Sequence, residues 1–120
     1  MKYSILVYLS EDDIAAQTDP ARAPAHFAAY AAYAKALSEA GVLAGGAGLQ
    51  TPGTATTVRL RGGARQVQDG PFAVTKEQLA GFFTIEVPDL DRALEWAARC
   101  PSVATGSAEV RPHLPAMAGS

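Results

Sequence analysis

Short apolar runs separated by turn residues mark the strands that we expect in this chain. Residues 3–9 are rich in β-branched and aromatic side chains, and apolar side chains fall on both faces of the run. A strand with one face in water would alternate more cleanly between apolar and polar residues. We also predict strands over residues 82–87 and 108–111. The pattern therefore predicts a sheet whose first strand is apolar on both faces.

Residues 24–40 have the spacing of a helix that packs one side on a sheet. Pro24 suits the first turn, where a backbone N–H is not needed, and Gly41 is a suitable C-terminal cap. The many alanines of this segment favour a helix and allow close packing. The predicted buried stripe consists of Phe27, Ala31, Ala34 and Leu37.

A second helix is predicted over residues 90–99. Asp89 precedes it and is a good N-cap. Trp96 lies off the inward side, with Arg92 and Arg99 at helical spacing, so we expect it to stack on an arginine. The predicted inward stripe consists of Leu90, Ala93, Leu94 and Ala97.

Several segments between these elements carry turn residues. We interpret residues 11–23 as a polar connection. We predict a short strand that opens at 42–44 and has a glycine-rich end, and one helical turn at 75–79. The glycine-rich residues 45–48 are followed by neither a lysine nor a helix start, so they do not form a phosphate loop. A close backbone approach or a bulge explains these glycines better.

A β-hairpin is predicted in the middle of the chain. Thr56–Arg61 and residues 65–68 are expected to pair across a two-glycine turn at residues 62–63. Alternation along the first of these strands predicts that Val58 and Leu60 face the core.

The order of the elements predicts an α+β fold: a ferredoxin-like antiparallel sheet with two helices on one face and an inserted β-hairpin. We expect one domain over residues 1–112 and a loose tail over 113–120. The second sheet face is left uncovered, and Leu6, Tyr8 and Phe82 are expected to point that way. Such a face needs a partner, so we expect a homodimer through the open sheet face.

Composition narrows the classes of protein. The chain has 120 residues, 48% hydrophobic and 18% charged, with a net charge of −2, which fits one globular domain and disfavours nucleic-acid binding. Its single cysteine excludes an internal disulfide and a cysteine-based zinc site. No run approaches the roughly 20 apolar residues of a membrane span, and acidic residues follow the first apolar run at once. We therefore expect a cytoplasmic protein without membrane contact.

The Asp-Gly-Pro-Phe motif at residues 69–72, together with residues 75–83, 87–91 and 93–99, resembles the DGPF branch of the YCII-related family. The similarity covers the chain from Met1 to about residue 112. It implies a ferredoxin-like fold paired as a dimer of the α+β barrel type, with a pocket near the dimer sheet. Most members have no established activity. A His–Asp catalytic pair has been proposed in the broader group, and one relative is a dehydrochlorinase of a chlorinated aromatic diol.

The resemblance also indicates candidate site residues. His26 matches the histidine that YCII proteins carry in their first helix, whereas the position of the family aspartate, before a proline, is Cys100 here. Asp69 of the Asp-Gly-Pro-Phe motif is the evident substitute carboxylate. Tyr30 follows His26 by one helical turn and is either a pocket donor or a packing residue.

Each of these residues also has a purely structural interpretation. His26 has an intrinsic pKa near neutrality, which suits a general acid or base, but it could equally be a histidine on a helix surface. The Asp-Gly-Pro-Phe motif either aims Asp69 into a pocket or forms only a rigid corner in which Phe72 plugs the core. Cys100 is interpreted as a small buried apolar residue and His113 as solvated.

Three hypotheses for the function follow. The first is a cofactor-free small-molecule enzyme in which His26 is the acid or base, Asp69 orients it or balances its charge, and Tyr30 donates a hydrogen bond. The second is a non-catalytic ligand-binding or regulatory module, supported by the frequent occurrence of DGPF proteins beside alternative sigma factors. The third is an adaptor that works through the sheet face. No set of metal ligands and no nucleotide or flavin motif appears in the sequence.

Overall fold

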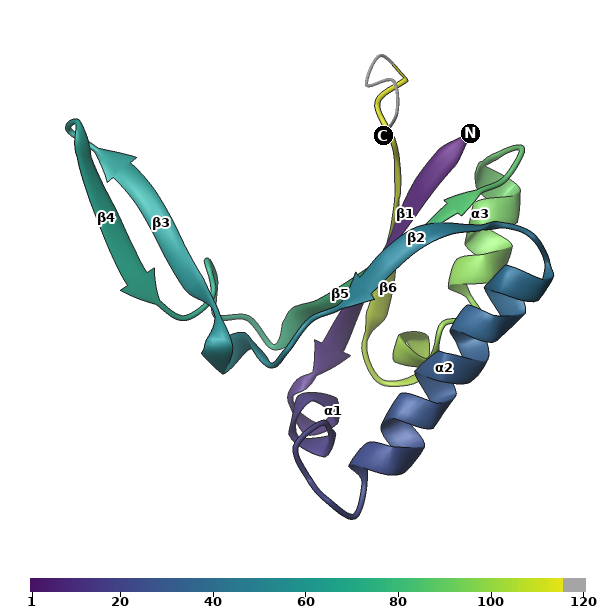
Figure 1. Cartoon of the computed structure of the whole chain (residues 1–120), viewed down its shortest axis with the longest axis horizontal. Helices are drawn as coiled ribbons and strands as arrows, with labels where there is room; N and C mark the ends of the chain where they lie inside the picture. The colour runs from purple at the N-terminus through teal and green to yellow at the C-terminus, as the bar shows by residue number, and fades with distance from the viewer. Residues whose placement is uncertain (116–120) are drawn as a thin grey trace.

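A four-stranded antiparallel sheet with the strand order β2-β5-β1-β6 organises the computed structural model, which describes residues 1–115 (Figure 1). The central strands are β1 (Lys2–Ser10) and β5 (Glu77–Glu86), and the edge strands are β2 (Leu43–Gly48) and β6 (Ser107–Pro112). Each neighbouring pair is antiparallel. This is the predicted ferredoxin-like α+β fold, which is therefore confirmed. Most of the predicted tail at 113–120 lies outside the described residues.

Two helices, α2 (Ala23–Glu39) and α3 (Leu90–Ala97), cover one face of this sheet. The predicted N-cap of α3 is confirmed, because the Asp89 carboxylate accepts a hydrogen bond from the backbone N–H of Arg92 at 2.9 Å. Among the described residues, no helix is long and apolar enough to cross a membrane. The two helices therefore form one layer over one side of the sheet.

A short helix, α1 (Glu11–Ala16), occupies much of the segment that we interpreted as a polar connection. The Ser10 side chain caps it by accepting a hydrogen bond from the backbone N–H of Asp13 at 3.3 Å. Acidic residues in the first turn complement the positive end of the helix dipole. The interpretation of 11–23 as a polar connection therefore missed a helix.

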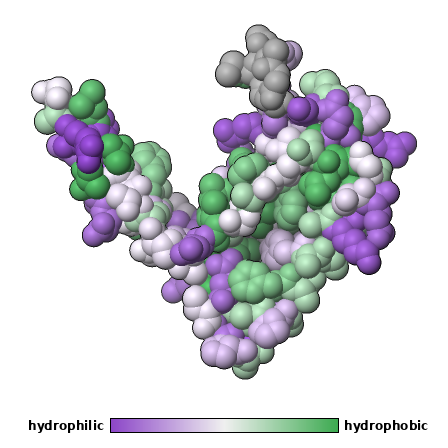
Figure 2. All heavy atoms as spheres, viewed as in Figure 1, coloured by the Kyte–Doolittle hydropathy of each residue, from purple (hydrophilic) through white to green (hydrophobic). Residues whose placement is uncertain are grey.

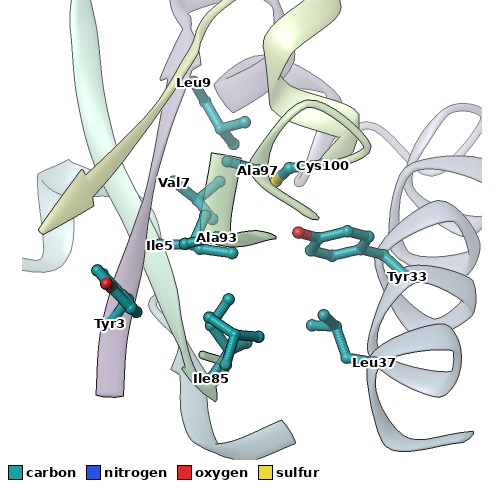
Figure 3. Close-up of a cluster of buried hydrophobic side chains, with 11 residues drawn as sticks. Tyr3, Ile5, Val7, Leu9, Tyr33, Leu37, Ile85, Ala93, Ala97 and Cys100 are labelled. Carbon is teal, nitrogen blue, oxygen red and sulfur yellow. The ribbon is translucent and has the colours of Figure 1, made fainter. Parts of the chain in front are cut away.

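The hydrophobic core lies between the sheet and the two helices (Figure 3). Alternate residues of β1 point into it, as the period of a strand requires. Tyr33 lies opposite them and donates a hydrogen bond from its hydroxyl to the backbone carbonyl of Trp96 at 2.7 Å, which ties α2 to the end of α3. The main buried side chains are Tyr3, Ile5, Val7, Leu9, Leu37, Ile85, Ala93, Ala97 and Cys100.

Only part of each predicted helix stripe is buried. On α2, Leu37 is buried as predicted, but Phe27 is 53% exposed, and Tyr33 takes the core position instead. On α3, Ala93 and Ala97 are buried, whereas the leucines at 90 and 94 are about half exposed. The prediction missed this because periodicity gives the apolar side of a helix but not how far the sheet extends beneath it.

Two further predictions concern the chain between α2 and α3. The strand predicted to open at 42–44 and to have a glycine-rich end is confirmed as β2, which runs to Gly48 with a register shift between Leu43 and Gly45. The shift agrees with the predicted bulge. The helical turn predicted at 75–79 is absent, because β5 begins at Glu77 and pairs there with Ser10.

The predicted hairpin is present and forms a separate two-stranded sheet, β3 (Thr56–Arg61) and β4 (Ala64–Asp69). We call residues 56–69 the arm, because Figure 1 shows the hairpin projecting away from the rest of the chain. Val58 and Leu60 were expected to face the core but are 61% and 66% exposed. Phe72, offered as a core plug, is 80% exposed. Val58 and Leu60 alternate with polar residues as in a strand with one buried face, but no described part of this chain covers these two side chains.

The second face of the main sheet has no helix over it. Leu6 lies opposite Phe82 on β5 and Glu109 on β6, so these three share that face. The Tyr8 hydroxyl donates a hydrogen bond to the Glu109 carboxylate at 3.3 Å. His113, predicted to be solvated, is half-buried, and its Nε2 lies 2.8 Å from the hydroxyl of Ser4. This face therefore has an apolar part, formed by Leu6 and Phe82, and polar groups beside it.

Candidate functional site

A hollow of about 490 Å³ lies between α2 and the sheet edge formed by β2 and β5. Its size falls within the range of sites for small molecules. Most of its walls are apolar, and the polar side chains among its lining residues are Gln17, His26 and Tyr30. We call it the α2 hollow.

The α2 hollow is open because small residues line both of its long walls. On the helix, Ala31 and Ala34 from the predicted stripe face the hollow instead of the core. On the sheet, the glycines of β2 bring its backbone against β5: a Cβ on Gly46 would lie 2.5 Å from the carbonyl oxygen of Phe82, and one on Gly81 would lie 2.7 Å from that of Ala47. Glycine at these positions allows the approach, and the same lack of side chains leaves room for a ligand.

His26 lies in the first turns of α2, where Pro24 begins the helix. Its ring is half-buried and contacts two aromatic rings, those of Phe27 and Tyr30, each with a centroid separation of 5.2 Å. The structure therefore places a titratable group on the wall of a mostly apolar hollow. An imidazole in that position can bind the polar part of a ligand or transfer a proton.

Tyr30 lies on the same face of α2 as His26, as predicted, but its hydroxyl is hydrogen-bonded to the Ser102 side chain. Burial raises the pKa of this hydroxyl well above its usual value, and a hydrogen bond with the Ser102 side chain opposes the rise only in part. The ring of Tyr30 thus forms the wall, and its hydroxyl stays protonated at neutral pH.

Beneath this wall, the side chains of Cys100 and Ser102 form a buried polar pair next to the backbone carbonyl of Ser107. The Ser102 hydroxyl donates to the backbone carbonyl of Ser107 at 2.9 Å, and the Cys100 Sγ lies 3.3 Å from the Ser102 oxygen. Because the single hydroxyl proton of Ser102 is used on Ser107, the thiol of Cys100 is the donor in that contact. Cys100 is 1% exposed, which confirms the predicted small buried residue.

Gln17 lines the α2 hollow and was not found from the sequence. It is the C-cap of α1, the helix that we had interpreted as a loop. The available signal was Ser10 followed by three acidic residues, a pattern that marks a helix start. A glutamine amide can both donate and accept hydrogen bonds, so it suits recognition of an uncharged polar group.

Asp69 is the last residue of β4 and is exposed on the arm. It does not line the α2 hollow, so one chain does not bring it together with His26 and Tyr30 there. Among residues 1–115, no group of three or more His, Cys, Asp or Glu side chains gathers as metal ligands would. The pairing of His26 with Asp69 stays a prediction, and it would need the Asp69 of a second copy.

A second hollow, of about 640 Å³, lies where the arm joins the open side of the sheet. Tyr8 and Leu79 line it from the sheet, and Phe72 and Thr57 line it from the arm and its base. Burial raises the pKa of the Tyr8 hydroxyl, and the neighbouring Glu109 carboxylate adds to this rise. We call this hollow the arm angle.

Comparison with known proteins gives two findings. The model of the YCII-related domain family matches residues 1–116. An uncharacterised protein of Rhizobium meliloti (strain 1021) is 47% identical over 76 residues, which are 62% of this chain and 61% of that protein. The match thus spans less than two thirds of the length of that relative.

Proposed function

The chain belongs to the YCII-related domain family, and from this premise we propose that it is a cofactor-free enzyme acting on a small, largely apolar molecule in the α2 hollow. Within the family we assign it to the DGPF branch, on the Asp-Gly-Pro-Phe motif at residues 69–72. The observation that carries the proposal is one imidazole, His26, on the wall of an otherwise mostly apolar hollow of about 490 Å³.

The walls favour an aromatic ligand. Phe27 and Phe83 offer ring faces and edges, and the alanines and glycines between them leave a space without projecting side chains. A flat ring can enter such a space and contact the aromatic walls. The Gln17 amide and the His26 imidazole are then available to a hydroxyl or carboxylate group on that ring.

His26 supplies the chemistry as a general base and acid. In an isomerisation, its neutral imidazole removes a proton from a carbon next to the polar group of the substrate and returns that proton to another carbon. In an elimination, the imidazole removes a proton from carbon, and the electron pair of that C–H bond forms a new double bond as the leaving group departs with its own bonding pair. The imidazolium later releases the proton to water. Tyr30 remains a wall residue whose hydroxyl supports the position of the helix through Ser102.

The test begins with a ligand search. A panel of single-ring aromatic alcohols and acids is screened for a rise in melting temperature, and each compound that binds is incubated with the protein and analysed for products by mass spectrometry. We expect His26→Ala to keep its fold and bind the compound but to lose at least about 100-fold in turnover, which is the lower bound for positioned acid–base catalysis. Turnover by His26→Ala at the rate of the unmodified protein would contradict the proposal.

The alternative is a ligand-binding or regulatory module associated with sigma-factor-type transcription control. It uses the same hollow but requires no proton transfer. Turnover separates the two cases, and Phe27→Ala locates the binding site, because it removes a wall of the hollow while leaving His26 in place. A compound whose binding is lost in Phe27→Ala, but which no form of the protein converts, would support the binding module.

We also propose a homodimer through the open sheet face. The support is an apolar centre of Leu6 and Phe82 beside the polar residues Tyr8 and Glu109, which is the usual composition of an interface core and rim. A two-fold contact would place the same patch on both copies. Light scattering coupled to size-exclusion chromatography tests it, and a monomer of 12.4 kDa at micromolar concentration would contradict it.

A further inference from the structure

Within residues 1–115, the contacts that support the arm lie at its base. Strands β3 and β4 pair only with each other, and the main sheet does not include them. A lone two-stranded hairpin is at best marginally stable in water. At its base, the Thr57 hydroxyl donates to the carbonyl of Gly70 at 2.9 Å, and the Gly70 N–H donates to the carbonyl of Ala55 at 2.7 Å. These contacts close the base of the hairpin but leave its length uncovered.

One face of the arm carries three neighbouring apolar side chains, with Arg65 and Asp69 on the same face at its two ends, and we call it the apolar face. Val58 lies directly opposite Val67, and Leu60, two residues on from Val58, lies on the same face. These three side chains are 54% to 66% exposed. The other face carries Arg59 opposite Gln66. The alternation along β3 is the pattern of a strand with one buried face. The structure instead half-buries Thr57 and Arg59 on the other face and leaves Val58 and Leu60 exposed.

The exposed apolar surface continues from the arm toward the sheet. Phe72 and Val74, in the segment between β4 and β5, are 80% and 89% exposed, and Leu79 on β5 is 41% exposed. Figure 2 shows hydrophobic surface on the arm as well as on the rest of the chain. Phe72 and Leu79 line the arm angle, and the Arg59 guanidinium lies 5.5 Å from the centroid of the Phe72 ring, which places Phe72 beside the other face of the arm.

The total surface is larger than a compact monomer needs. The chain exposes 7677 Å², whereas a compact monomer of this mass exposes about 6,100 Å². The radius of gyration is 15.9 Å, against about 13.6 Å for a compact chain of this length. The surplus, about 1,500 Å², exceeds the roughly 800 Å² that each partner buries in a standard protein–protein interface.

Charge identifies the partner. The arm contains Arg59, Arg61, Arg65 and one acid, Asp69, so its net charge is +2, and the rest of a chain whose total is −2 carries −4. A second copy therefore offers an acidic body to this basic arm. It also offers its own arm to the acidic body of the first copy, so a two-fold arrangement satisfies both.

We propose that the arm docks through the face of Val58, Leu60 and Val67 on a second copy of this chain, while the arm of that copy clasps the first copy in return. This inference takes its partner from the homodimer of the proposed function and adds a second, separate contact to it. The apolar face of Val58, Leu60 and Val67 is then buried in the dimer. The arm gains in the dimer the support that it lacks in one chain.

The test compares adjacent positions on opposite faces of the arm. Val67→Glu and Gln66→Glu introduce the same charge, but only Val67 lies on the apolar face. Dimer dissociation constants are measured by sedimentation equilibrium at several protein concentrations. We expect Val67→Glu to weaken the dimer at least about 100-fold, since each dimer loses two buried valines. Gln66→Glu should change the constant by less than about threefold.

Two further variants keep the outcomes distinct. Replacing residues 56–69 with a short glycine-serine linker removes the arm without touching the main sheet, and should weaken the dimer as Val67→Glu does. Leu6→Glu disrupts the open sheet face instead. If Leu6→Glu weakens the dimer while Val67→Glu and the linker variant leave it unchanged, the arm inference is overturned and the sheet-face homodimer stands. A monomeric unmodified protein overturns both.

Discussion

Replacing Leu37 and Phe27 with alanine, one at a time, separates the two functions of α2. Leu37 is fully buried against the sheet, so truncation removes its contacts and leaves a cavity, at about 2–5 kcal/mol of unfolding free energy. Phe27 is 53% exposed on the wall of a hollow that is already open. Truncation of Phe27 creates no new enclosed cavity. Because only about half of the ring is buried, the loss of unfolding free energy is limited to about 1–2 kcal/mol.

The order of these two losses is the critical result. The helical stripe read from sequence makes Phe27 a core residue, and truncating a buried phenylalanine costs about 3–5 kcal/mol, at least as much as truncating Leu37. The structure predicts the opposite order. A loss for Phe27→Ala equal to or larger than that for Leu37→Ala would refute the account of the α2 hollow.

Urea unfolding followed by circular dichroism measures both losses. For a chain of this length, each 1 kcal/mol corresponds to about 4 °C in melting temperature, so Leu37→Ala should melt about 8–20 °C lower and Phe27→Ala about 4–8 °C lower. Both variants are measured at two fixed protein concentrations, because dimerisation would add its own concentration-dependent stability.

Three other predictions follow from single positions. Gly106→Ala should destabilise the fold by more than about 2 kcal/mol, because its Cβ would lie 2.3 Å from the carbonyl oxygen of Tyr8; Gly53→Ala, with nothing within 4 Å, is the matched control in urea unfolding. The Cys100 thiol, 1% exposed, should react with a thiol reagent only as fast as the protein opens, and reaction at the rate of a free thiol would contradict its burial. The pKa of the Asp19 carboxyl should lie below 3.8, because the backbone N–H two residues on and then the neighbouring arginine stabilise its charge. The ionised Asp19 carboxylate therefore stabilises the fold above pH 3.8, and this stabilisation is lost as the pH falls through the folded-state pKa. Below that pKa, Asp19→Asn should have the same free energy of unfolding as the unmodified protein. An NMR titration that gives a pKa of 3.8 or more for Asp19 would contradict this.

Local chemistry made several elements predictable from the sequence. The apolar run of β1, the Asp89 cap of α3 and the two-glycine turn of the arm depend on neighbouring residues alone. The stacking of Trp96 was predictable for the same reason, and the guanidinium of Arg99 lies 4.4 Å from its ring centroid. In each case the residues that decide the structure lie within a few positions of one another.

The direction in which an element faces was harder to predict. Val58 and Leu60 alternate with polar residues as core strands do, and nothing local records that the hairpin leaves the main sheet. For the same reason, the resemblance singles out His26 and Asp69, but the sequence does not contain the long-range geometry that decides whether they meet, so their pairing stays a prediction. Gln17 was missed because α1 was not recognised.

The most direct test of the function is a crystal soaked with the same panel of single-ring aromatic alcohols and acids. The account predicts electron density for a ring in the α2 hollow, beside Phe27, with its polar group within hydrogen-bonding distance of the His26 imidazole. Fragments that bind only elsewhere, or an α2 hollow filled by side chains of the protein itself, would contradict it.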